Sequence, residues 1–203
     1  MHISWLGGTC VKLQTKNEDK DITIVIDPYK PEKGSFPRSL APDIALFSNT
    51  QKNSITLSQN PFVIDSLGEM EVQKAMIYAV PGENQVIFKI NSEDMNLVHL
   101  GTITKKPKSE ILDKLDTPDI LLIPVGGEPY LDIKEVADLV TSLEPRIVIP
   151  IGYKSDNDPK LKDVELFLKE IGLKPEEKTQ KIIIKPKDLP QEETRLILLE
   201  KSS

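Results

Sequence analysis

The chain has 203 residues, with 26 basic and 32 acidic side chains and a formal net charge of −6 at pH 7. This length favours one domain, and the acidic balance argues against binding nucleic acid or an anionic membrane surface through a basic face. No segment approaches the roughly 20 apolar residues of a membrane span, and the N-terminus lacks the basic and apolar regions of a secretory signal, so we expect a cytoplasmic protein.

Soft metal ligands are scarce in this sequence. The chain contains one cysteine, Cys10, and two histidines, His2 and His99. One cysteine permits no internal disulfide, in keeping with a reducing compartment. Because these three side chains form no cluster, the sequence excludes a zinc finger and argues strongly against a histidine-rich dinuclear centre. A carboxylate site for Mg²⁺ or Ca²⁺ stays open.

The first half of the chain predicts β-strands and turns. Apolar or alternating runs on either side of Gly7-Gly8 indicate a hairpin, and a β-branched run ends at the turn signal Asp27-Pro28. The predicted strands are residues 3–6, 10–15, 21–26, 44–47, 62–65, 72–80, 85–90 and 97–100, with loops over 28–42 and 48–60.

The second half alternates strands with helices. Ser109 is a candidate cap for the first helix, Asp132 caps the second, and Gly172 ends the third. The predicted helices are 109–115, 132–143 and 159–171, and the predicted strands are 119–124, 146–150, 181–185 and 194–200. Because the strands between helices are continuously apolar, we expect an α/β domain with two facing sheets and helices outside.

Seven ordered segments carry a resemblance to a known family. They are residues 5–10 (WLGGTC), 26–29 (IDPY), 67–72 (LGEMEV), 99–102 (HLGT), 121–127 (LLIPVGG), 145–150 (PRIVIP) and 187–190 (KDLP). In this order they resemble the metallo-β-lactamase fold, in particular its small branch of bacterial and archaeal zinc-dependent hydrolases. The resemblance implies a four-layer αββα sandwich forming a single domain over residues 1–203.

The metal ligands that the resemblance would supply are replaced. In the family an HxHxDH signature follows the strand equivalent to 44–47, an aspartate ends the HLGD run, and a histidine follows the strand equivalent to 147–150. The residues at these positions are Asn49, Gln51, Asn53, Ser54, Thr102 and Gly152. Amides and hydroxyls are weak neutral ligands for Zn²⁺, and glycine has no side chain. We therefore expect no zinc cofactor and no catalytic residue, with a polar loop or a small-molecule or peptide cleft instead.

Asp27 and His99 are further pocket candidates beside these positions. Asp27 follows a buried strand and His99 lies in an apolar one, so we interpret both as structural. A metal-free Ser–His–Asp hydrolase lacks support because no G-x-S-x-G elbow is present.

Two hypotheses of function follow. The first is a catalytically degenerate member of the fold that acts as a binding or assembly module for a small molecule, a protein or a second copy of itself, since a fold does not fix a function. The second is a hydrolase with an atypical Mg²⁺ or Mn²⁺ site, which requires several carboxylates to converge. Its candidate ligands are Asp43, Asp65, Glu69 and Glu128.

Overall fold

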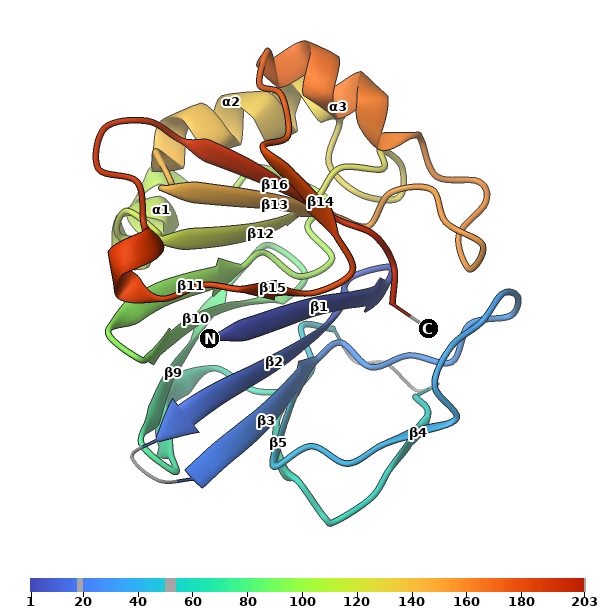
Figure 1. Cartoon of the computed structure of the whole chain (residues 1–203), viewed down its shortest axis with the longest axis vertical. Helices are drawn as coiled ribbons and strands as arrows, with labels where there is room; N and C mark the ends of the chain where they lie inside the picture. The colour runs from blue at the N-terminus through green and yellow to red at the C-terminus, as the bar shows by residue number, and fades with distance from the viewer. Residues whose placement is uncertain (18–19, 50–53, 203) are drawn as a thin grey trace.

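Two β-sheets lie face to face in the computed structural model, which describes residues 1–17, 20–49 and 54–202 (Figure 1). Apolar side chains from both sheets form one large buried cluster, which includes Trp5 from the first sheet and Phe88 from the second. The predicted mixed α/β fold with two facing sheets is confirmed.

The first sheet has six strands and is built mainly from the N-terminal part of the chain. Strand β1 is antiparallel to β2 and β2 to β3, whereas β3, β5 and β7 run parallel. The order is β15 (Ile182–Ile183), β1 (His2–Gly7), β2 (Cys10–Asn17), β3 (Lys20–Ile26), β5 (Ile44–Leu46) and β7 (Phe62–Ile64).

The second sheet has eight strands. Its central strands β11, β12, β13 and β16 are parallel, and every residue of β12 and β13 is buried, as their continuous apolar sequences predict. The order is β14 (Glu177–Thr179), β16 (Arg195–Leu199), β13 (Ile147–Ile151), β12 (Ile120–Pro124), β11 (Met95–His99), β10 (Val86–Ser92), β9 (Ala75–Pro81) and β8 (Gly68–Val72).

Three helices lie on the side of the eight-stranded sheet (Figure 1): α1 (Ser109–Leu115), α2 (Ile133–Leu143) and α3 (Val164–Ile171). The carboxylate of Asp132 accepts the Lys134 N–H at 3.0 Å, which confirms the predicted cap of α2. None of these helices is long and apolar enough to cross a bilayer, within the part of the chain described above.

A loop covers the outer face of the six-stranded sheet. Leu6, Cys10 and Val25 point outward from that sheet and pack against three half-buried side chains of the loop that follows β3. These loop residues are Tyr29, Phe36 and Leu40. The fourth layer of the sandwich is therefore formed by this loop over residues 28–40.

The strand predicted over 72–80 is wrong as a single element. The chain reverses at Gln73 and Lys74, which have φ of 51° and 65°, so that β8 and β9 form a tight hairpin. The polar loop predicted over 48–60 contains a short strand, β6 (Thr56–Leu57), which pairs with β4 (Ser39–Leu40). Such two-residue strands have no period long enough to be detected.

The third predicted helix begins at Val164 and not at Pro159. The backbone of Lys162 is used elsewhere, since its N–H donates to Gly126 and its carbonyl accepts from Lys154. The cap of α1 is Lys108 and not Ser109, which is the first helical residue. The strand predicted over 181–185 is reduced to β15, and β14 before it was not predicted.

Candidate functional site

Three candidate positions from the sequence, Asp27, Thr102 and Gly152, follow the carboxyl ends of parallel strands, and so does Ser48. In the first sheet, Asp27 and Ser48 follow β3 and β5; in the second, Thr102 and Gly152 follow β11 and β13. The carboxyl ends of parallel strands share one edge of a sheet, where ligands of open α/β folds commonly bind. We call this edge of the sandwich the rim, defined by Asp27, Ser48, Asn49, His99, Thr102, Tyr130 and Gly152.

Asp27 makes buried hydrogen bonds that connect residues of the rim. It is fully buried, and its carboxylate accepts the Ser48 N–H at 2.6 Å and the Ser48 hydroxyl at 2.7 Å. The Ser48 carbonyl in turn accepts the N–H of Val86, on β10 of the other sheet, at 2.7 Å. Charged, buried hydrogen bonds are among the strongest in proteins. Asp27 thus fixes the start of the loop that would carry the HxHxDH signature and links it to both sheets.

His99 uses both of its ring nitrogens inside the protein. Its Nδ1 accepts the Gly101 N–H at 3.0 Å, so Nε2 carries the proton and donates to the Thr9 carbonyl at 2.9 Å. The residue is fully buried; burial lowers the pKa of His99, and the charge of Asp27 opposes that shift. His99 is therefore a neutral side chain that links the two sheets, and neither of its ring nitrogens is available to a ligand.

Gly101 brings the segments that precede Asn49 and Thr102 close together. It has φ of +62°, and a Cβ at this position would lie 2.5 Å from the Ser48 Cβ. The residues that follow Ser48 and Gly101 are Asn49, which is exposed, and Thr102, which is half-buried. Only glycine permits this close approach of the two chains.

Gly152 lies in a space that neighbouring side chains already fill. Its φ is +56°, and a Cβ there would lie 2.9 Å from Pro124 Cβ and 3.1 Å from Tyr130 Cε2. Burial, and then the charges of Asp158 and Asp27, raise the pKa of the Tyr130 hydroxyl. A neutral phenol thus lies beside Gly152.

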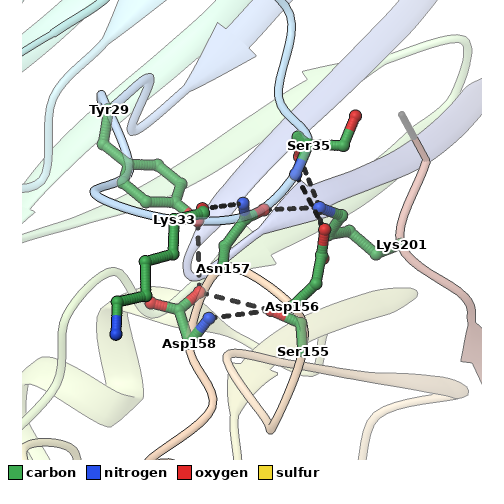
Figure 2. Close-up of polar contacts among 8 residues, drawn as sticks. All are labelled: Tyr29, Lys33, Ser35, Ser155, Asp156, Asn157, Asp158 and Lys201. Atoms are coloured by element: carbon green, nitrogen blue, oxygen red, sulfur yellow. Dashed lines mark hydrogen bonds and ion pairs between the residues drawn. The ribbon is translucent and has the colours of Figure 1, made fainter.

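A second polar network adjoins the rim and fastens the covering loop (Figure 2). The Tyr29 hydroxyl donates to Asp158 at 3.1 Å, and the buried Asn157 donates to the Lys33 carbonyl at 2.6 Å. Lys201 donates to the Ser35 carbonyl at 2.5 Å and to Asn157 Oδ1 at 2.6 Å.

Asp156 completes this network (Figure 2). It accepts the Ser35 N–H at 2.8 Å and pairs with Lys201 at 2.5 Å. These two hydrogen bonds, that of Lys201 first, lower the pKa of Asp156. Asp163 pairs separately with Lys154 at 3.2 Å. Asp156, Asp158 and Asp163 therefore each bind different partners, and sequence spacing did not reveal the contacts of Asp156 and Asp158 with the covering loop.

Of the three remaining predicted positions, the structure describes one. Gln51 and Asn53 lie outside the described residues. Ser54 is half-buried, and its hydroxyl donates to the Ile55 carbonyl at 3.2 Å. It lines a shallow pocket of about 320 Å³ together with Lys30 and Arg38.

The carboxylates required by the atypical-site hypothesis do not converge. Asp43 precedes β5, at the end opposite the rim, where it accepts the Thr23 N–H at 2.8 Å. Asp65, Glu69 and Glu128 are exposed. Across residues 1–17, 20–49 and 54–202, no three His, Cys, Asp or Glu side chains are grouped as a metal ion requires.

Comparison with known families and solved structures identifies the class of protein to which this fold belongs. Residues 2–152 match the family described as the β-lactamase superfamily domain. A metallo-β-lactamase superfamily protein from Thermotoga maritima, described as a candidate Zn-dependent hydrolase, superimposes with a TM-score of 0.83. It is 25% identical in sequence, and the match covers 98% of each chain.

The sequence relatives narrow the class to a family. A UPF0173 metal-dependent hydrolase of Methanosarcina mazei is 30% identical, over 92% of this chain and 96% of the relative. A UPF0173 relative from Methanopyrus kandleri is 21% identical, over 84% and 91%. The chain belongs to the UPF0173 metal-dependent hydrolase family of the metallo-β-lactamase superfamily, as the sequence resemblance predicted.

Proposed function

We propose that this chain is a member of its family that has lost the hydrolytic metal site and acts as a binding or assembly protein. The observation that carries the proposal is the chemistry of the replaced positions. Amides, hydroxyls and a glycine stand where imidazoles and carboxylates would bind the cation, and Zn²⁺ sites require such donors.

Three features of the rim support this proposal. The imidazole of His99 is engaged on both nitrogens, the carboxylate of Asp27 is engaged by Ser48, and the space beside Gly152 is filled by Tyr130. The polar side chains at the rim do not fit a zinc ion, and we infer that they satisfy one another or bind a neutral polar ligand through hydrogen bonds.

The direct test is the metal content of the protein purified without chelators from medium supplemented with zinc, iron and manganese. We expect less than about 0.1 metal ion per chain, because each lost ligand weakens a site severely. Stoichiometric metal of any of the three kinds would contradict the proposal.

A gain-of-ligand variant serves as the positive control. Asn49→His, Gln51→His, Asn53→Asp and Ser54→His together recreate the HxHxDH spacing in the loop after β5. We expect this variant, measured beside the wild-type chain, to retain more zinc, which shows that the assay can detect metal in this fold.

A further inference from the structure

Two lateral faces of the sandwich expose apolar side chains. Among the residues that the structure describes, five large hydrophobic side chains are about half exposed, and four of them lie on edge strands or the link between them. These four are Phe62, Val63, Leu67 and Ile183. Apolar side chains gathered on sheet edges are typical of sites where another chain docks.

The first of these faces, which we call the acidic face, is formed by β7, β8 and the link between them. Each strand is the last in its sheet, so one side of its backbone has no neighbouring strand. The face comprises Phe62, Val63, Asp65, Leu67, Glu69 and Glu71. Its three carboxylates are exposed, and within the described chain none of them makes an ion pair.

The second, which we call the basic face, lies on the opposite edge of both sheets and includes β15 (Figure 1). It comprises Lys178, Lys181, Ile183, Lys185 and Lys187, of which Lys178 is already paired with Glu200 at 3.2 Å. Lys181, Ile183 and Lys185 alternate along the chain and line a groove of about 550 Å³. The groove also contains Asp21 and Glu93, and Glu93 is already paired with the amine of Met1.

We propose that copies of this chain associate head to tail, with the acidic face of one copy docked on the basic face of the next. The charges are complementary, and each face presents exposed apolar side chains beside an open strand edge. The strand directions also fit: β7 runs with β3, whereas β15 runs against it, so β15 of one copy meets β7 of another antiparallel.

A symmetric contact between two acidic faces fits less well. It would bring Asp65, Glu69 and Glu71 of one copy against the same carboxylates of the other, and like charges opposite each other destabilise strand pairs. A head-to-tail contact avoids this repulsion, and it produces rings or open chains of subunits. The contact supplies the proposed assembly role with a partner, but it uses no ligand position and does not depend on metal content.

The test is sedimentation velocity of the full chain from about 5 to 300 µM at low and high salt. We expect the average mass to rise with protein concentration at about 50 mM salt and to fall back at about 500 mM, because screening weakens exposed charge pairs. A protein that stays monomeric at every concentration at low salt would overturn the proposal.

Charge-reversed variants locate the contact. We expect Glu69→Lys/Glu71→Lys and Lys181→Glu/Lys185→Glu each to weaken self-association at least about tenfold. Mixing these two variants should restore association, because each reversed face then meets its complement. Lys106→Glu/Lys160→Glu makes the same charge change as the basic-face variant but in exposed loops elsewhere, and it should associate like the wild type.

Circular dichroism and urea midpoints confirm that each variant is folded before its mass is measured. Association that is unchanged in Lys181→Glu/Lys185→Glu would place the contact on another surface and overturn the proposal. Failure of the mixed variants to associate, while each alone is folded, would overturn it as well.

Discussion

Asp27 shows how one buried carboxylate can organise the rim. Its two oxygens are used by the N–H and the hydroxyl of Ser48, which place the loop after β5 against the second sheet. The same residue was a pocket candidate from sequence, and its contacts are those of a support for the neighbouring turn. We therefore expect substitution of Asp27 to lower the stability of the folded protein.

We expect Asp27→Ala to lower the free energy of unfolding by about 3 kcal/mol, because it leaves two buried donors of Ser48 without an acceptor. Ser48→Ala should cost about 2 kcal/mol, since it leaves one buried carboxylate oxygen of Asp27 without its donor but keeps the bond from the Ser48 N–H. Urea titration followed by the fluorescence of Trp5, the sole tryptophan, measures both.

Asp43→Ala is the matched control for Asp27→Ala. Asp43 also accepts an N–H from a neighbouring strand, but it is half-buried and makes one such bond. We expect a loss of about 1 kcal/mol. An equal loss from the two substitutions would show that Asp27 has no special role at the rim.

His99 should make stability depend on pH. Its pKa in the folded protein is lowered by burial, so between the unfolded value near 6.5 and the lower folded value the unfolded chain binds more protons. This contribution is present above about pH 6.5 and is lost as pH falls, by up to about 1.4 kcal/mol per pH unit.

His99→Gln should flatten that part of the stability profile, because an amide can bond to Gly101 and Thr9 without titrating. The measurement is urea unfolding of both proteins at pH steps from 7.5 to about 5. His2 is retained in both, so its own lowered pKa cancels in the difference. Identical pH dependence of the two proteins would contradict the assignment.

At the scale of elements, the contacts of Lys201 hold the loop over residues 28–38 in place, and we call them the Lys201 clamp. The side chain of Lys201 is 11% exposed and makes three contacts, to Ser35, Asp156 and Asn157. A lysine this buried loses more than an exposed ion pair when it is removed, because its partners are left in a poorly solvated site.

We expect Lys201→Met to lower the free energy of unfolding by about 2 kcal/mol and to speed tryptic cleavage of the loop. Cleavage should occur after Lys33 and Arg38, since Lys30 precedes a proline. Lys154→Met is the control, because its ion pair with Asp163 has both partners about half exposed. It should change stability by less than about 0.5 kcal/mol.

The covering loop also gives the whole molecule one weaker side. Helices pack on the eight-stranded sheet, whereas the outer face of the six-stranded sheet has only Tyr29, Phe36 and Leu40 over Leu6, Cys10 and Val25. Cys10 is fully buried in this small cluster, and burial, with the charge of Asp27 second, raises its thiol pKa. Labelling of Cys10 therefore requires the loop to open.

We expect Phe36→Ala to accelerate labelling of Cys10 by a disulfide reagent at least about tenfold, because it removes apolar contacts that hold the loop closed. Phe62→Ala, on an exposed edge, should leave the rate unchanged. Cys10 is the only thiol in the chain, so the labelling rate is unambiguous. Equal rates in wild type and Phe36→Ala would mean that the thiol is reached by another route.

The sequence predicted long, strongly patterned elements well. The apolar runs of β12 and β13 and the capped helix α2 were placed to within a residue or two. Helix α3 was extended too far because periodicity cannot show that Lys162 is engaged with Gly126 and Lys154. Short strands such as β6 and β14 depend on partners distant in sequence.

For the candidate site, sequence reasoning supplied only positions. Among them, Asn49, Thr102 and Gly152 follow β5, β11 and β13 in the structure. Sequence reasoning did not identify Tyr130 or the Lys201 clamp, because both act through contacts between segments far apart in the chain. The available signals were two tyrosines: Tyr29, two residues after Asp27, and Tyr130, three residues after Gly127.

The packing around Gly152 limits which residues position 152 can hold. A histidine introduced there would meet Pro124 and Tyr130 and would have to adopt an unfavourable backbone angle. Both neighbours would therefore have to shift or change, and neither change alone brings a donor atom to the rim. A single substitution at 152 is for this reason a poor route to a metal ligand at this place in the fold.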